Sequence, residues 1–177
     1  DEARHLRAHS KGRVKFTLPG PMTICDTIAD EHYGSRPDMA MAFAELLNQE
    51  ALELEAAGAD VIQFDEPAFN VFMDDVNEWG IATLDRALEG LKCTRAVHIC
   101  YGYGIQANRE WKKTLGSEWR QYEEIFPALN ASRIDQVSLE SAGSRVPRNL
   151  MTLLKDKEIM VGCVTVTGDR VESPEEV

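Results

Sequence analysis

The sequence predicts a parallel α/β fold of the (β/α)8 TIM-barrel type, of which the chain covers about five strands. Five short apolar runs alternate with longer segments of helical periodicity, which is the pattern of repeated β-α-β units. No glycine-rich phosphate loop follows any of these runs, which weakens a dinucleotide-binding alternative. A closed barrel needs about 250 residues, whereas this chain has 177. We therefore expect one barrel domain over residues 1–177, incomplete at both ends, with an open parallel sheet as the structural alternative.

Each predicted strand is a short apolar run, and the first three stop at turn-forming residues. The first run stops at Pro19, the second at Pro67 and the third at Gly102. The fourth and fifth runs each follow a segment with a helical pattern, which continues the alternation. The predicted strands, in chain order, are residues 14–18, 60–65, 95–100, 136–140 and 159–166.

The segments between the strands carry helical signals. The first is the clearest, because Ser35 and Pro37 are typical of a helix start and Gly58 of a helix end. Apolar residues between these positions recur at helical spacing, so one face of the helix is apolar. The predicted helices are residues 37–57, 82–91, 118–129 and 147–154, and residues 173–176 indicate the start of another.

Composition and charge exclude several classes of protein. The formal net charge is −11 and no basic stripe occurs, which argues against nucleic-acid binding. No apolar run approaches the roughly 20 residues needed to span a bilayer, and residues 1–11 are polar, unlike a signal peptide. The four cysteines are scattered without a disulfide-like framework. We therefore expect a reducing, cytoplasmic setting and no membrane partner.

Three polar clusters stand at the carboxyl-terminal ends of predicted strands. Asp65 and Glu66 end the second strand, His98 and Cys100 end the third, and Glu140 ends the fourth. In barrels these ends converge on one mouth, where active sites form. Side chains two residues apart on a strand point to the same side, so His98 and Cys100 can both reach one zinc ion. Glu140 on the adjacent strand would supply a third, oxygen ligand.

Each cluster, taken alone, also has a purely structural interpretation. Asp and Pro are common turn residues, so residues 65–67 fit a plain turn. Glu140 fits a surface or salt-bridged carboxylate, and a single His-x-Cys pair is a weak metal signal. The convergence of acids, imidazole and thiol at successive strand ends favours a functional site.

The same residues resemble the motifs of the cobalamin-independent methionine synthase family. Residues 60–68 are similar to its IQ-D-EPA signature, and residues 98–101 are similar to its H-x-C-Y zinc motif. Residues 139–141 resemble its I-E-x-S glutamate motif, and residues 18–23 resemble its GP-T segment. Order and spacing agree from about Val14 to the end, and the agreement of several separated motifs makes the resemblance specific.

The resemblance implies a zinc-dependent methyltransferase that moves a methyl group to the thiol of homocysteine and so forms methionine. It implies that His98, Cys100 and Glu140 are ligands of Zn²⁺ and that Asp65 binds the amino group of homocysteine. Coordination to zinc deprotonates a thiol that is otherwise mostly protonated at neutral pH. The fold implied is the family's catalytic barrel.

Three further residues are candidates for substrate contact. Glu66 adjoins Asp65 in the acidic motif. Tyr101 follows the zinc motif, where either lining a pocket or packing a loop fits its position. His32 lies in the loop after the first predicted strand, on the side where the mouth of a barrel would form.

The chain also departs from the family's pattern. The family's fourth zinc ligand is a cysteine expected beyond Val177, and Cys163 is not its equivalent because it falls inside the fifth predicted strand. Thr165 and Thr167 stand where methionine synthases carry an Asp and a His, the His being a proposed acid, which leaves the proton donor open. The chain resembles the short, single-barrel branch of the family, whose methyl donor would be methyltetrahydrofolate or a methylated corrinoid.

Two other functions stay open at this point. A related zinc- and corrinoid-linked thiol methyltransferase would keep the fold and the metal but change the donor or the thiol. Alternatively, the chain is an inactive fragment or a non-catalytic subunit. A half barrel would expose the edges of its first and last strands, which favours self-association.

Overall fold

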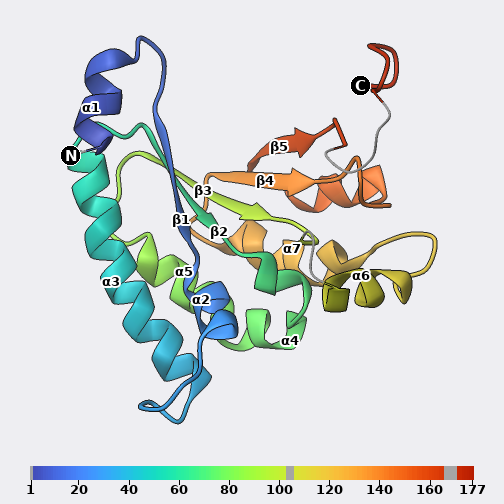
Figure 1. Ribbon diagram of the computed structural model, residues 1–177, viewed down its shortest axis with the longest axis horizontal. Helices are drawn as coiled ribbons and strands as arrows, with labels where there is room; N and C mark the ends of the chain where they lie inside the picture. The colour runs from blue at the N-terminus through green and yellow to red at the C-terminus, as the bar shows by residue number, and fades with distance from the viewer. Residues whose placement is uncertain (1, 103–105, 166–170) are drawn as a thin grey trace.

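The computed structural model describes residues 2–102, 106–165 and 171–177, which form one parallel sheet covered by helices (Figure 1). The sheet has the order β1-β2-β3-β4-β5, and all its pairs are parallel. Strands that follow one another in chain order are the arrangement of a (β/α)8 barrel, so the predicted fold class is confirmed. The strands are β1 (Lys15–Pro19), β2 (Val61–Asp65), β3 (Thr94–Ile99), β4 (Gln136–Glu140) and β5 (Glu158–Gly162).

The helices that connect the strands lie on one face of the sheet, and Figure 1 shows the other face uncovered in the described part of the chain. Right-handed crossovers between consecutive parallel strands place every connection on the same side. The helices are α1 (Glu2–His9), α2 (Pro21–Thr27), α3 (Arg36–Ala56), α4 (Met73–Asp75), α5 (Ile81–Ala87), α6 (Gln106–Lys113) and α7 (Gln121–Ala131), with shorter helical turns η1 (Pro67–Asn70), η2 (Val76–Gly80) and η3 (Arg148–Leu153).

The hydrophobic core lies between these helices and the covered face of the sheet. Ile62 and Phe64 of β2 are fully buried in it, and Val97 of β3 and Val137 of β4 continue the same layer. Burying an aliphatic or aromatic side chain of this kind contributes about 1.5–3 kcal/mol to folding. Because strand side chains alternate, the residues between these apolar ones point to the uncovered face. That face is therefore polar, and it carries the candidate site.

Several boundaries differ from the predicted ones. β5 ends at Gly162, so Cys163 is an exposed residue after the strand and not a residue inside it. Residues 174–176 form a turn where a helix start was expected. The sequence predicts no helix at α1, α2 or α6. α6 was missed because it has few apolar residues, and α2 because its first turn overlaps the Pro-Gly-Pro segment that marks a strand end.

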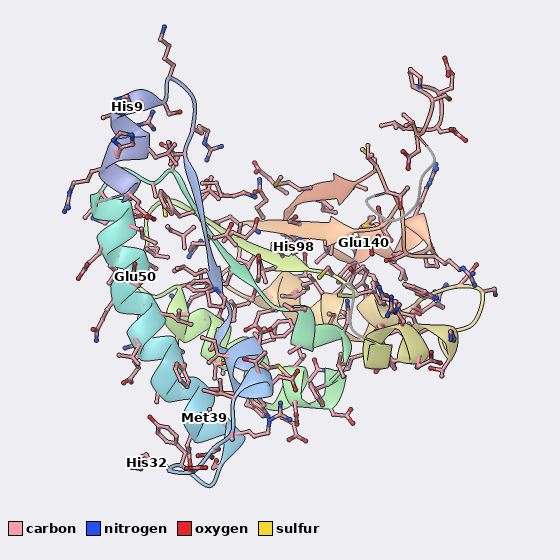
Figure 2. All side chains as sticks on the ribbon, in the orientation of Figure 1. His9, His32, Met39, Glu50, His98 and Glu140 are labelled. Carbon is pink, nitrogen blue, oxygen red and sulfur yellow. The ribbon has the colours of Figure 1, made fainter. Side chains whose placement is uncertain are left out.

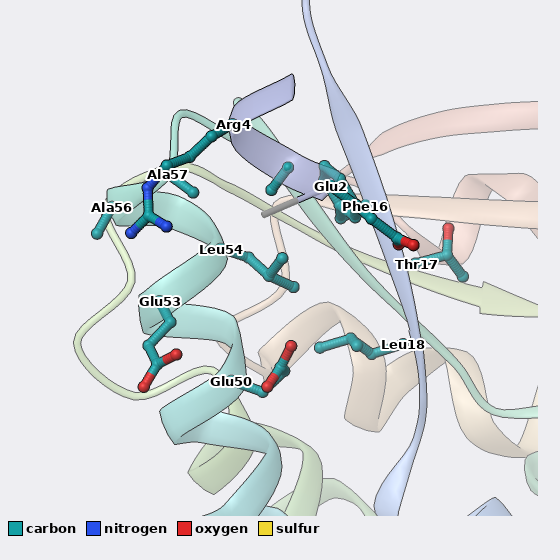
Figure 3. A pocket seen from close by; sticks show the side chains of 11 residues that line it. Glu2, Arg4, Phe16, Thr17, Leu18, Glu50, Glu53, Leu54, Ala56 and Ala57 are labelled. Carbon is teal, nitrogen blue, oxygen red and sulfur yellow. The ribbon is translucent and has the colours of Figure 1, made fainter. Parts of the chain in front are cut away.

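The outer strands of the sheet have open edges in the described residues. Met160 and Val161 of β5 are 42% and 49% exposed. Beside β1, a groove of about 520 Å³ lies between α1, the strand and α3, and Leu18 and Leu54 contribute to its walls (Figure 3). None of the predicted site residues lines this groove. Among the helices of the described segments, none has the length and apolar character needed to cross a membrane.

Candidate active site

A row of side chains crosses the uncovered face of the sheet at the ends of the strands. Backbone pairing sets Asp65 of β2 opposite His98 of β3, and His98 opposite Ser138 of β4. All three are half-buried. Cys100 follows β3 and Glu140 ends β4, and Figure 2 shows His98 and Glu140 on this pair of neighbouring strands. The structure thus brings the predicted catalytic and metal-binding residues to one edge of the sheet.

Backbone hydrogen bonds extend the sheet beyond β1 and β2 at this edge. The amide of Gly20 donates to the carbonyl oxygen of Asp65 over 2.8 Å. The amide of Glu66 donates to the carbonyl oxygen of His98 over 2.9 Å. The loops that leave β1 and β2 are therefore paired with the neighbouring strand, and the backbone of Asp65 and His98 is fixed.

Two buried side chains hold the ends of β3 and β4. The phenol oxygen of Tyr122, on α7, lies 3.1 Å from the carbonyl oxygen of Ile99 and 3.3 Å from that of Glu140. The side-chain amide of Asn70 donates to the carbonyl oxygen of Cys100 over 2.9 Å. Both side chains are almost completely buried. The strand ends that carry the thiol and the carboxylate are thus anchored from the helical layer.

The electrostatic surroundings of Cys100 favour its neutral form. Burial raises the pKa of its thiol, and the negative charges of Glu140 and Asp65 raise it further, against the lowering effect of Lys112. Burial also raises the pKa of the Glu140 carboxyl, although a hydrogen bond from the Gly143 amide opposes this. A buried thiol next to carboxylates ionises readily only when a cation is bound beside them.

The donor atoms at this edge are of the types that zinc prefers, namely imidazole nitrogen, thiolate sulfur and carboxylate oxygen. The ring nitrogen Nδ1 of His98 lies 3.0 Å from the hydroxyl of Ser138, which leaves Nε2 for another partner. No three His, Cys, Asp or Glu side chains in the described segments are gathered closely enough to hold a metal ion. The donor types of His98, Cys100 and Glu140 fit zinc, and binding would require these side chains to draw together.

Glu66 has a structural place that its sequence position does not reveal. Its carboxylate has no exposed surface and accepts hydrogen bonds from the amides of Met22 and Thr23 and from the hydroxyl of Thr23. These amides belong to the first turn of α2, so Glu66, which follows the neighbouring strand β2, caps that helix. Burial raises the pKa of the Glu66 carboxyl to about 7. The expected substrate contact of Glu66 has no support in this geometry.

Tyr101 is buried in an aromatic cluster. It is 1% exposed, its ring centroid lies 4.8 Å from that of Trp119 and 5.2 Å from that of Tyr122, and its hydroxyl donates to Gln121 over 3.2 Å. Together with Cys100 it also borders a small cavity of about 140 Å³. Packing of the loop, the second reading of its position, fits this environment.

His32 is not brought to the site, and Thr165 lies in the segment after β5. His32 is exposed in the loop before α3, and Figure 2 places it at the far end of the molecule from His98. Thr165 is half-buried, and its amide donates to Glu172 over 2.8 Å. Thr167 lies outside the described residues.

Comparison with known proteins shows the family to which the chain belongs. The family model described as "Cobalamin-independent synthase, Catalytic domain" matches residues 3–177. The chain belongs to the cobalamin-independent methionine synthase family. A solved structure of this kind, a B12-independent methionine synthase from Shewanella sp. W3-18-1 in complex with selenomethionine, is 60% identical. It superposes with a TM-score of 0.94 over 99% of this chain and 51% of that chain.

Curated members of the family are more distant. The methionine synthase of Sulfurisphaera tokodaii is 31% identical over 164 residues, which are 93% of this chain and 43% of that protein. The methionine synthase of Saccharolobus islandicus is 32% identical over 168 residues, which are 93% of this chain and 44% of that protein. The chain therefore spans about half the length of the family members it matches.

The residues that support the site carry little signal in the sequence. Gln63 and Ser138 contact the side chains of Asp65 and His98, and Tyr122 and Asn70 hold the strand ends. The contact of Gln63 with Asp65 could be predicted from the sequence, because Gln63 lies two residues before Asp65 on the same face of the strand. The other contacts cross between elements 30 or more residues apart or, for Tyr122, reach back from a helix, and no local pattern encodes them.

Proposed function

We propose that the complete protein transfers a methyl group to the thiol of homocysteine, forming methionine, with the help of zinc. The observation that carries this proposal is the position of Asp65, His98, Cys100 and Glu140 at the carboxyl-terminal ends of the neighbouring strands β2, β3 and β4. Family membership supports the same reaction. Because homocysteine and Cys100 must stay reduced, we infer a cytoplasmic setting.

His98, Cys100 and Glu140 would hold the metal. When bound, zinc would hold the substrate sulfur as a thiolate at neutral pH and so make it a nucleophile. The negative charges of Cys100 and Glu140 would keep that sulfur electron-rich. The Ser138 hydroxyl next to Nδ1 would orient the imidazole of His98 toward the metal.

Asp65 would bind the ammonium group of homocysteine through its carboxylate. Selenomethionine is methionine with selenium in place of sulfur, and the Shewanella protein is in complex with it. A 60% identical relative that binds such a close analogue of methionine supports an amino-acid site here. A charge-assisted pair between Asp65 and the ammonium group contributes about 1.5–3 kcal/mol to binding.

The methyl group would come from methyltetrahydrofolate or from a methylated corrinoid. In either case the sulfur forms a new S–C bond and the thiol proton is lost. The bond between the donor and the methyl group breaks, and its electron pair stays on the donor. The folate nitrogen needs a proton to leave, whereas a reduced corrinoid leaves without one. Thr165 and Thr167 in place of an acid and a histidine favour the second donor.

The test is methionine formation by the complete, zinc-loaded polypeptide, given homocysteine with each donor in turn. We expect turnover with one donor. In Cys100→Ser we expect activity to fall by about 100-fold and most of the bound zinc to be lost, because even a lost support of a metal ligand costs about 10–100-fold. Cys163→Ser is the matched control, because Cys163 is exposed and lies after β5. If the folded, zinc-loaded protein forms methionine with neither donor, the proposed reaction is excluded.

A further inference from the structure

We propose that Gln63 and Lys15 are positioning residues, which fix the Asp65 carboxylate for the amino group of the substrate. The proposal rests on the function proposed above, in which Asp65 binds the ammonium group of homocysteine. Lys15 belongs to β1, and Gln63 and Asp65 belong to β2. All three side chains meet on the uncovered face of the sheet.

The three side chains form a continuous chain of hydrogen bonds. The amide nitrogen Nε2 of Gln63 donates to Oδ1 of Asp65 over 2.8 Å. The ammonium group of Lys15 donates to Oε1 of Gln63 over 2.5 Å. Gln63 is only 7% exposed, so its amide is held in place by its surroundings.

Lys15 determines which way the Gln63 amide points. A lysine ammonium group has three donors and no acceptor, so only the oxygen of the amide can face it. The NH₂ group of Gln63 must then face Asp65, where it donates to the carboxylate. Without Lys15 the amide could turn over and present its oxygen to Asp65, which would repel the carboxylate.

The arrangement leaves one oxygen of Asp65 for a ligand. Oδ1 is engaged by Gln63, whereas Oδ2 has no hydrogen bond to any residue that the structure describes. Gln63 is neutral, so it orients the carboxylate without cancelling its negative charge. The side-chain amide of Gln63 lies between the ammonium group of Lys15 and the carboxylate of Asp65. A substrate ammonium group therefore meets an oriented carboxylate that still carries its charge.

The experiment compares two test variants with a control variant and with the conservative variant Lys15→Arg, all in the complete zinc-loaded protein. Gln63→Leu removes the donor to Asp65, and Lys15→Met removes the group that orients the amide. Lys15 is exposed, so its variant retains the fold if Gln63→Leu fails to fold. Gln136→Leu is the matched control, since Gln136 lies two strands away in the same row as Gln63 and donates to Glu158.

We expect the KM for homocysteine to rise about 10-fold in both test variants, the effect of one hydrogen bond to a charged group. The KM for the methyl donor and the zinc content should stay as in the wild type. Lys15→Arg, which also has only donors, should restore most of the loss. A merely structural role would lower kcat and leave the two KM values unchanged.

Two results would overturn the proposal. One is an unchanged KM for homocysteine in both Gln63→Leu and Lys15→Met, in an otherwise active enzyme. The other is an equal rise in the control Gln136→Leu. A wild type that makes no methionine is a different result, because it removes the proposed reaction itself and this inference with it.

Discussion

Some side chains in this protein form hydrogen bonds with elements far from their own strand in the sequence. Glu66 follows β2 in the acidic motif, yet its carboxylate caps α2, which begins more than 40 residues earlier. Burial raises its pKa from the ordinary 4.5 to about 7. Asp65, the adjacent residue, is half-buried on the uncovered face. Two neighbouring acids therefore have separate roles, one structural and one proposed to bind substrate.

The raised pKa of Glu66 makes its contribution to stability depend on pH. Because the folded protein binds this proton more tightly than the unfolded chain, the contribution is fully present below about pH 4.5 and is lost as the pH rises toward 7. In the variant Glu66→Gln the side chain is neutral at every pH, so its contribution to stability does not fall as the pH rises. We expect the free energy of unfolding of the wild type, relative to Glu66→Gln, to fall by roughly 3 kcal/mol between pH 4.5 and 8.

Urea unfolding of both proteins at several pH values measures this difference. The same titration in the variant subtracts the other ionisable groups, which the two proteins share. A difference that stays constant across this pH range would show that Glu66 has an ordinary pKa in the folded state.

At the residue scale, the sequence predicts the site only where the strand pattern places side chains. Asp65, His98, Cys100 and Glu140 follow from their positions at strand ends, and the structure brings them to one edge. Glu66 and Tyr101, which the sequence makes candidates for substrate contact, are both buried in the structure, and their contact with substrate stays a prediction. An acid or a tyrosine beside a motif is equally compatible with facing the substrate or the helical layer, and only packing decides.

At the scale of elements, α2 depends on a close approach between two motifs. Gly20 precedes its first turn and packs against Glu66, so an added Cβ would lie 2.1 Å from the carboxyl carbon of that residue. The backbone of Gly20 has an extended conformation that any residue adopts. Steric contact alone therefore requires glycine here, and the GP-T and IQ-D-EPA segments fold against each other.

We expect Gly20→Ala to lower the free energy of unfolding by about 1–3 kcal/mol, because Glu66 must leave the amides of α2. Gly12→Ala is the matched control, since a Cβ at Gly12 meets no atom within 4 Å, and its change should stay within about 0.5 kcal/mol. Chemical denaturation measures both. Equal stability of the two variants would contradict the close contact at Gly20.

Elements with local signals were predicted well, and those without were not. α3 was predicted within one residue at each end, because Ser35 caps it and Pro37 lies in its first turn. β4 was predicted with its observed bounds. The start of α2 depends instead on the distant Glu66. The end of β5 was set too late because apolar residues continue past Gly162 without pairing.

At the scale of the whole molecule, the described residues form an open segment of a barrel with a polar inner face. The chain spans about half the length of the relatives it matches, and the sheet order agrees with the barrel type. The open edges at β1 and β5 fit the self-association expected from the sequence, which stays a prediction. The zinc site likewise stays a prediction, because the donor side chains are not drawn together in the described structure.

X-ray absorption at the zinc edge, on the complete zinc-loaded protein with and without homocysteine, tests the proposed site most directly. We expect sulfur scatterers at about 2.3 Å from zinc in the free protein, and one more after homocysteine is added. A spectrum that shows no sulfur near zinc and does not change with homocysteine would contradict both the zinc site and the activation of the substrate thiol.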